Sequence, residues 1–267
     1  RQATVDNFGP AGNPFNPNTP STPTGTNRPL QHFDAISPKI GFVYRTTPTS
    51  QLYFNASRAY EAPLNLELLS SVNANGTPNT GFLNLDAQRA WQLELGHRGT
   101  SADKRYNWDL TVYNLEMQKE ILASIINNQG TFQNANGTRH TGVEAGGGMV
   151  LGKGLFSQGG AGKEDSLQTR VAYTWSRFKF TDNVFAGSGA NQVVIARDGN
   201  TVAGAPEHSL NMEVRYDHPG GWWIAPNVEW SLSGFYTDYN NTIKNPSYAL
   251  INLRSGWSID EHWTLFA

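Results

Sequence analysis

The chain has 267 residues, of which 38% are hydrophobic, 12% aromatic and only 16% charged, and its formal net charge is −2. Because it lacks the basic excess that neutralises phosphates, this composition argues against nucleic acid as a partner. The chain contains no cysteine, which excludes disulfide scaffolds, thiolate metal sites and cysteine nucleophiles.

The first element is irregular. Residues 1–35 are predicted to form a loop or tail, because repeated prolines prevent regular secondary structure there. The chain starts without a methionine or a signal peptide and stops inside a strand-like run, so we expect a fragment of a longer protein. It contains no run of about 18 apolar residues, so no transmembrane helix is expected.

From residue 36 onward, strand-like runs alternate with turns. We expect strands near 36–45, 51–60, 88–99, 106–125, 138–151, 167–178, 206–217, 222–236, 248–258 and from 263. Short turns are expected at 46–50, 100–105, 218–221 and 259–262, and longer links at 61–87, 126–137, 179–205 and 237–247. One link departs from this rhythm, since residues 152–166 should form a short turn but are long and rich in glycine.

Most of the runs alternate apolar and polar residues, and the clearest example is 222–233. One face reads Trp222, Ile224, Pro226, Val228, Trp230, Leu232, and the other reads Trp223, Ala225, Asn227, Glu229, Ser231, Ser233. This run is longer than the average soluble strand of about five or six residues. With tryptophan near both ends, it is closer to a membrane-crossing strand of about ten residues. Pro226 cannot donate to a sheet ladder, so we expect a bulge or a lost hydrogen bond there.

Two all-β architectures fit this pattern. A soluble, secreted binding module, such as a carbohydrate-binding sandwich or a propeller, predicts that the apolar face of 222–233 packs inside against a second sheet. An outer-membrane barrel predicts that the same face points outward to lipid, with Asn227 and Glu229 inside. The alternation of short turns with long links, and the aromatic residues at strand ends, favour the barrel.

Several segments add a family likeness. Residues 57–68 carry an Arg, an aromatic residue, Ala-Pro and then Glu-Leu, and residues 85–99 end in Glu-Leu-Gly-His-Arg-Gly. In order and spacing these segments resemble the C-terminal barrel region of TonB-dependent outer-membrane receptors. Asp86-Ala87-Gln88 replaces the commoner Lys-Pro-Glu of that family. Further matching pieces are Val112-Tyr113-Asn114, Ile121, Asn134, Thr141-Gly142-Val143-Glu144 and residues 205–211.

The resemblance implies an antiparallel transmembrane β-barrel of about 22 strands, whose lumen holds an N-terminal plug domain. About ten strands fall in residues 36–267, which are therefore expected to form a partial barrel without the plug. Residues 1–35 would be an extracellular loop or tail. An open half-barrel exposes two unpaired sheet edges, so we expect it to be part of a larger object.

The resemblance also implies a function. It indicates a receptor in the bacterial outer membrane, surrounded by lipid, that takes up a metal chelate, by default a ferric siderophore. Energy would come from the TonB–ExbB–ExbD complex through the plug region. Haem, cobalamin, other metal chelates and oligosaccharides are alternative cargoes within the family. The cycle contains no covalent chemistry, so we expect a transporter without a cofactor and not an enzyme.

Candidate site residues fall into two groups. Polar residues on the expected lumen face either hold and release the plug or simply line a wet lumen, and the second role is favoured for any single residue. They are Glu94, Asp109, Glu144, Arg170, Glu213, Arg215, Glu229 and Arg254. Ligand contacts are expected on the long loops and the upper wall, where Arg and aromatic side chains suit anionic or catecholate groups; otherwise these residues pack within the loops. The candidates are Tyr60, Phe82, Arg139, Phe185, Arg197, Tyr236 and Tyr239.

The sequence contains no motif for metal binding, phosphate binding or covalent catalysis. The histidines lack a His-x-x-x-His spacing and no cysteine is present, so no protein-ligated metal is expected. The glycine-rich pieces at 146–148 and 152–162 lack the Gly-Lys-Ser/Thr ending of a phosphate loop and a following helix. No Ser, His and acidic residues show a recognisable catalytic spacing.

Overall fold

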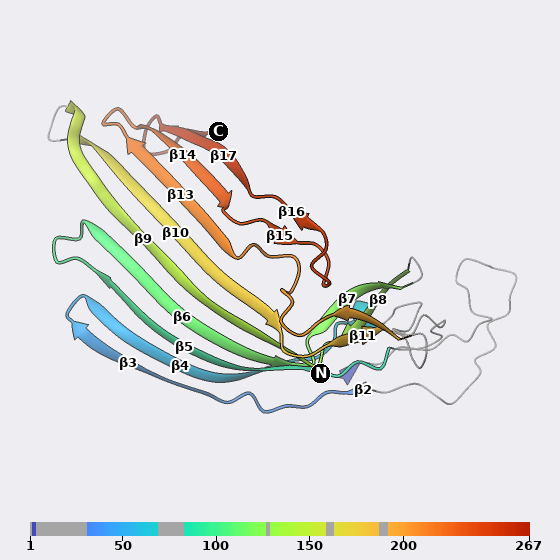
Figure 1. Cartoon of the computed structure of the whole chain (residues 1–267). Helices are drawn as coiled ribbons and strands as arrows, with labels where there is room; N and C mark the ends of the chain where they lie inside the picture. Colours follow the sequence, from blue (N-terminus) through green and yellow to red (C-terminus); the bar gives the residue numbers. More distant parts are fainter. Residues whose placement is uncertain (1, 4–30, 69–82, 127–128, 159–162, 187–191) are drawn as a thin grey trace, which may run out of the picture.

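The computed structural model describes residues 2–3, 31–68, 83–126, 129–158, 163–186 and 192–267. Ten strands form one antiparallel sheet that curves into an open trough (Figure 1). Each strand pairs with the next strand of the sheet along the chain, as in a meander. In chain order the strands are β3 (Lys39–Thr47), β4 (Ser50–Glu61), β5 (Gln88–Thr100), β6 (Tyr106–Gln118), β9 (Gly137–Gln158), β10 (Glu164–Phe180), β13 (His208–Asp217), β14 (Trp222–Ser231), β17 (Tyr248–Ser258) and β18 (Thr264–Phe266).

The remaining elements lie in the longer connections. Figure 1 shows the short turns at the left end of the sheet, which we call the short-turn end, and small hairpins at the right end, the loop end. The small elements are β1 (Gln2–Ala3), β2 (Gln31–His32), α1 (Asn65–Leu68), β7 (Ile121–Ile126), β8 (Gln129–Asn134), β11 (Val184–Ala186), β12 (Val193–Ala196), β15 (Phe235–Tyr236) and β16 (Lys244–Asn245). Among the described residues, no helix is long and apolar enough to cross a membrane.

The apolar residues of successive strands lie opposite one another and form one continuous surface, the apolar face. Residues that pair directly across strands share a face of the sheet. Leu95 of β5 pairs with Val112 of β6. At the other side of the sheet, Met212 pairs with Val228, and Val228 with Ile251. The alternation along each strand therefore produces one apolar surface across the whole sheet.

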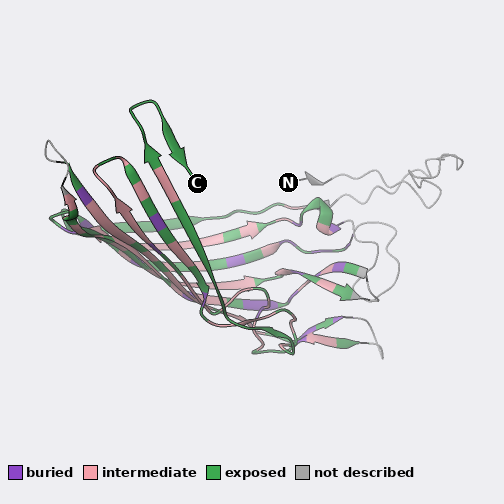
Figure 2. Cartoon of the chain, turned by 90° about the horizontal axis from the view of Figure 1, so that it is seen from above, coloured by how far each residue is buried: buried purple, intermediate pink, exposed green. Residues whose placement is uncertain are grey.

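The apolar face is exposed. Along β14 and just beyond it, Trp230 is 44% and Leu232 37% exposed, and no second sheet of the described chain covers them. Figure 2 shows that exposed and half-buried residues dominate the strands and that few residues are buried. A soluble sandwich would bury this face, because soluble proteins rarely expose contiguous apolar patches of more than a few hundred Å². The sandwich alternative is therefore wrong, and the expected all-β antiparallel barrel sheet of about ten strands is confirmed.

Several strand boundaries differ from the sequence-based expectation. The run 222–236 is divided into β14, which ends at Ser231, and β15, which pairs with β16 in a separate small sheet. The run 106–125 is broken at Lys119, whose φ of 60° turns the chain before β7 begins. The link 152–166, which departed from the long–short rhythm, is mostly strand, since β9 continues to Gln158 and β10 starts at Glu164. Gly152 and Gly154 of the glycine-rich piece therefore lie within the bounds of β9, whereas residues 159–162 lie outside the described residues.

Pro226 interrupts the ladder between β13 and β14, as expected. Glu213 pairs with Asn227, and the next pair is Tyr216 with Ile224, so two positions opposite the proline region are unpaired. The register is the same on both sides of this gap, which means that hydrogen bonding is lost without a bulge. On its other side, Pro226 pairs in register with Leu253 of β17.

Aromatic side chains lie over glycines of the neighbouring strand on the polar side of the sheet. Tyr53 pairs with Gly96 and Trp223 with Gly256. A side chain on Gly96 would overlap the Tyr53 ring, and a Cβ on Gly256 would lie 2.6 Å from the Trp223 indole nitrogen. Such aromatic cover compensates for the missing glycine side chain and pins the strand register.

Candidate functional site

The polar face lies opposite the apolar face, on the concave side of the sheet. Pairing carries it from strand to strand, since Arg98 pairs with Asp109, and Arg170 with Glu213. Strand alternation and register place every polar candidate on this face. They are Glu94, Asp109, Glu144, Arg170, Glu213, Arg215, Glu229 and Arg254.

Some of these side chains are bonded within the wall itself. Glu213 of β13 forms an ion pair with Arg254 of β17, across the intervening strand. The Arg215 guanidinium lies 2.6 Å from the Asp217 carboxylate and 4.2 Å from the centre of the Trp223 ring. These partners satisfy the charges locally, so they contribute to the structure of the wall.

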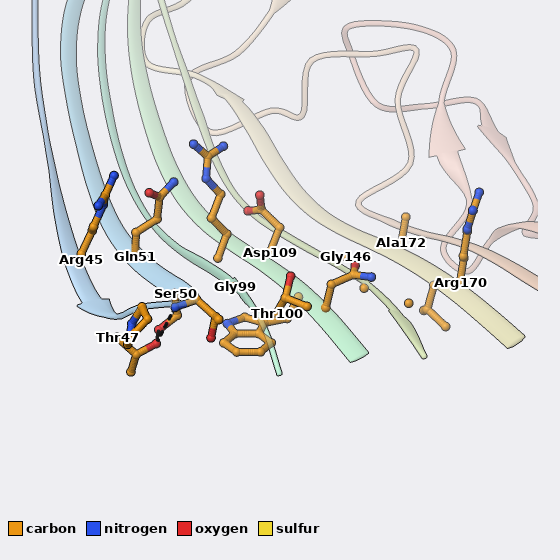
Figure 3. A pocket seen from close by; sticks show the side chains of 18 residues that line it. Arg45, Thr47, Ser50, Gln51, Gly99, Thr100, Asp109, Gly146, Arg170 and Ala172 are labelled. Atoms are coloured by element: carbon orange, nitrogen blue, oxygen red, sulfur yellow. Dashed lines mark hydrogen bonds between the residues drawn. The ribbon is translucent and has the colours of Figure 1, made fainter. Parts of the chain in front are cut away.

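A hollow of about 860 Å³ lies on the polar face at the short-turn end (Figure 3). Its floor is low because Gly146, Gly148 and Ala172 present almost no side chain on β9 and β10. Gly146 pairs with both Asp109 and Ala172, which places these small residues next to each other across the strands. The hollow is therefore formed by a local absence of side-chain bulk.

The rim of the hollow carries more positive than negative charge. Figure 3 shows that Arg45, Asp109 and Arg170 point from the strands to the same side. Arg98 lines the same hollow, with its guanidinium 5.3 Å from the centre of the Tyr53 ring. Within the described part of the chain, the guanidinium groups of Arg45 and Arg170 form no ion pair or hydrogen bond. Two guanidinium groups are therefore available to an anionic partner.

At the loop end, separate connections pack together around one hydrophobic cluster. Leu122 comes from β7, Phe180 from the end of β10, and Ala196 from β12. The cluster is completed by Ala135, which precedes β9, and by Val184 and Val202, which follow β10. Buried contacts between different connections hold them in fixed positions, so this end is a packed unit and not a set of independent loops.

Asparagine side chains link two of these connections. Asn241 accepts a hydrogen bond from the Thr201 backbone nitrogen at 2.6 Å and donates to the Thr201 carbonyl at 2.9 Å. The Asn200 side chain donates to the Tyr239 carbonyl at 2.8 Å. The connection after β12 and the turn between β15 and β16 are therefore tied by backbone-directed hydrogen bonds.

A nearly buried contact between a carboxylate and a histidine lies beside this cluster. The Glu120 carboxylate is 3.3 Å from the His140 ring nitrogen, and both side chains are 15% exposed. Burial raises the pKa of Glu120, but hydrogen bonds from His140 and Thr138 outweigh burial and leave the pKa lowered. The His140 ring also stacks on Phe178, with centroids 4.3 Å apart. No group of three or more His, Asp and Glu side chains in the described residues could hold a metal ion.

A family comparison fits this arrangement of curved strands, short turns and packed connections. The family model described as "TonB dependent receptor-like, beta-barrel" matches residues 4–267. The chain belongs to this family. The resemblance found in the sequence is thereby confirmed.

Solved receptor structures share the fold. The siderophore receptor PiuA from Acinetobacter baumannii has a TM-score of 0.60 and 16% identity, over 84% of this chain and 29% of that chain. The copper transporter OprC has a TM-score of 0.61 and 14% identity, over 84% and 31%. The ferric-catecholate import receptor Fiu from E. coli K12 has a TM-score of 0.60 and 16% identity, over 90% and 31%. This TonB-dependent receptor chain therefore spans 29 to 31% of the length of these receptors.

The predicted ligand residues of the receptor do not converge on one site. Phe185 on β11 is 43% exposed, and Arg197 is exposed just after β12. Tyr236 is half-buried, with the Lys244 ammonium 5.5 Å from its ring centre. Tyr239 packs edge-on against Phe180 at 5.7 Å and has its pKa raised by burial, so it belongs to the loop cluster.

Two other candidates point to the opposite side of the receptor wall. Strand alternation places Tyr60 at the end of β4 and Arg139 near the start of β9 on the apolar-face side. The Arg139 guanidinium forms an ion pair with the Glu116 carboxylate at 2.5 Å, so its charge is already paired within the wall. Phe82 lies outside the described residues, as does most of the predicted tail of residues 1–35.

Three notable residues of the receptor were not among the predicted sites. Arg45 could have been found, since the alternation of its strand places it on the same face as Gln51. Glu120 and His140 carry no such signal, because their contact joins the β6–β7 connection to β9 and depends on the folded loop end.

Proposed function

We propose that this chain forms part of the wall of an outer-membrane receptor that imports a ferric siderophore with energy from TonB. The observation that carries the proposal is the combination of an exposed, unbroken apolar face with a polar concave face. This combination suits lipid on the outside and a wet lumen on the inside. The short-turn end then faces the periplasm and the loop end faces the exterior.

The cargo is proposed from the relatives. PiuA is named as a siderophore receptor and Fiu as a ferric-catecholate import receptor, which supports a ferric siderophore here. OprC is named as a copper transporter, so another metal chelate is the alternative. In either case the receptor moves its cargo without a covalent step. The TonB–ExbB–ExbD complex would act through the plug region, and the receptor is then a transporter and not an enzyme.

We place the contact between wall and plug at the hollow of the short-turn end. Arg45 and Arg170 have no partner in the described wall, whereas Glu213 and Arg254 bind each other. A guanidinium without a local partner favours a carboxylate on the surface that meets it. An acidic segment of the plug fits this chemistry, while the other polar candidates hydrate the lumen.

Cargo contacts are proposed for the accessible side chains of the loop end. Phe185 and Arg197 are exposed, and Tyr236 keeps part of its ring accessible beside Lys244. Exposed aromatic rings and a guanidinium suit the planar, anionic groups that chelate iron. Tyr239 contributes by holding the loop cluster together.

Growth under iron limitation tests the function. A strain that lacks the full-length receptor gene is grown with one siderophore at a time from a panel, and with copper as a separate arm. We expect loss of growth with at least one ferric siderophore, restored by the plasmid-borne gene, and the same loss in a strain without TonB. A strain that grows normally on every iron source removes the iron assignment.

Charge reversal tests the contact at the hollow. In the full-length receptor, Arg170→Glu should loosen the plug and raise sensitivity to vancomycin, which is too large for closed barrels. Arg105→Glu is the matched control, because Arg105 is an exposed arginine of the short turn between β5 and β6. Equal sensitivity of the two variants contradicts the proposed contact.

A further inference from the structure

The strand β9 contains a large bulge near its end that the transport function leaves unexplained. Lys153 pairs with Ser166 and Gln158 with Glu164, so residues 154–157 stand opposite the single residue Asp165. Gly154 has a φ of 61°, a left-handed conformation that glycine adopts without strain. The extra residues therefore leave the ladder and form a small excursion from the sheet.

A buried carboxylate closes this bulge. Asp165 accepts hydrogen bonds from the backbone nitrogens of Leu155 at 2.7 Å, Phe156 at 2.8 Å and Ser157 at 2.8 Å. The Tyr216 hydroxyl donates to the same carboxylate at 2.9 Å. Asp165 is completely buried, and a buried charge is tolerated only when it is hydrogen-bonded. The four donors fix the bulge in one shape.

The bulge folds back over the apolar face. Gly152 and Tyr216 both pair with Leu167, which lies on that face. The Leu155 side chain lies over Gly152, and the Phe156 ring meets the Tyr216 ring edge-on with centroids 5.8 Å apart. In spite of these contacts, Phe156 is 75% and Leu155 50% exposed. The bulge thus presents two apolar side chains outward.

Aromatic rings surround this position at the short-turn end. Tyr216 and Trp222 have centroids 5.3 Å apart, and His218 stacks on Trp222 at 4.6 Å. Tyrosine and tryptophan at the end of an apolar strand face are typical of the boundary between lipid and water. Leu155 and Phe156 extend this aromatic group further outward.

We propose that residues 154–157 form a lipid anchor, in which Leu155 and Phe156 enter the phospholipid leaflet beside the short turns. The inference rests on the proposed membrane function. Lipid is the partner that fits these two side chains, because they continue the apolar face. The Asp165 carboxylate binds the backbone nitrogens of the bulge, so these polar groups are not left facing the lipid. The Asp165 carboxylate acts as the positioning group of the anchor.

Site-specific fluorescence in the full-length receptor tests the anchor. The described chain has no cysteine, so Phe156→Cys can be labelled with nitrobenzoxadiazole after any cysteine elsewhere in the receptor is replaced. The receptor is placed in vesicles of phosphatidylethanolamine and phosphatidylglycerol. We expect blue-shifted emission, loss of emission with nitroxide-labelled lipids, and little loss with aqueous iodide.

Two control positions separate this inference from the proposed function. Ile251→Cys reports the middle of the apolar face, where Ile251 is 81% exposed, and Lys104→Cys reports an exposed short turn. Lipid quenching at Ile251 with iodide quenching at Phe156 overturns the anchor and leaves the membrane function intact. Iodide quenching at both positions overturns the membrane function. A Phe156 label shielded from both quenchers indicates a protein contact and also overturns the anchor.

A second variant tests the role of the carboxylate. Asp165→Asn, combined with the label at residue 156, should shift quenching from lipid to iodide, because an amide cannot accept all the bonds that the carboxylate accepts. Glu164→Gln is the matched control at the neighbouring exposed residue. Barrel folding is checked by the heat-dependent mobility of each variant on gels. Unchanged lipid quenching in a folded Asp165→Asn receptor refutes the positioning role.

Discussion

Truncation of Phe180 should release the loop end of the receptor while the barrel strands stay folded. Phe180 is 1% exposed, lies at the centre of the loop cluster and packs edge-on against Tyr239 at 5.7 Å. Replacing a buried Phe by Ala costs about 3–5 kcal/mol. Phe180 is the last residue of β10 and the other cluster residues come from the connections, so the loss should fall on local opening at the loop end.

Hydrogen–deuterium exchange on the full-length receptor measures this opening. The backbone nitrogens of Val202 and Gly204 donate to Phe178 and Tyr236 at 3.0 and 2.9 Å, so they report the packed state. Since about 1.4 kcal/mol corresponds to a factor of ten, a loss of about 3–5 kcal/mol should accelerate exchange there by roughly 10²- to 4 × 10³-fold in Phe180→Ala. Amides of β4 and β5 should keep their protection.

Phe185→Ala is the matched control, because it removes an aromatic ring from β11 that is 43% exposed. It should change the exchange at Val202 and Gly204 by less than tenfold, since exposed substitutions usually cost about 0.5 kcal/mol or less. Unchanged protection in Phe180→Ala, or an equal effect of both variants, would refute the idea that the connections form one packed unit.

Two further changes probe other parts of the structure. Gly96→Ala should lower barrel stability by about 1–3 kcal/mol, because the new methyl group overlaps the Tyr53 ring; the midpoint of thermal unfolding on gels measures this. Gly130→Ala should have no such effect, since nothing lies within 4 Å of its Cβ, and Tyr53→Ala should relieve the Gly96→Ala variant. A hydrogen bond from the backbone nitrogen of Ile243 holds the pKa of Asp238 below its usual value. The carboxylate therefore stabilises the turn at any pH above the ordinary Asp pKa. This stabilisation is lost as the pH falls through the lowered pKa. Asp238→Asn should therefore speed amide exchange in the turn 237–243 at neutral pH. Lowering the pH should then reduce the protection of these amides less in the variant than in the unchanged receptor.

The strands were accessible to prediction because their signal is local. Leu95, Val112 and Val228 each alternate with polar neighbours, and alternation alone decides which face they join. The break at Lys119 was missed, because apolar residues continue on both sides of it and only the left-handed φ reveals the turn. Local pattern therefore predicted the wall well and its ends poorly.

The site was harder to predict, because its contacts join distant segments. Tyr239 was predicted as a ligand residue from its loop position alone, and its edge-on contact with Phe180 at the end of β10 could not be foreseen. The glycine-rich piece near Gly154 looked like a loop, but residues 154–157 form a bulge of β9 that is held by hydrogen bonds to the Asp165 carboxylate. Neither partner could be deduced from spacing along the chain.

Under the proposed transport function, the packed loop end has a consequence for how cargo would be captured. Because the connections are already joined through Phe180 and Asn241, their conformational entropy is lost when the receptor folds and not when cargo binds. Encounter then needs no slow ordering step, and the rate of capture is set by diffusion and orientation. Exposed residues such as Phe185 and Arg197 can change without disturbing the cluster beneath them. Under that proposal, substitutions at these exposed residues would change cargo preference while the buried cluster keeps the shape of the loop end.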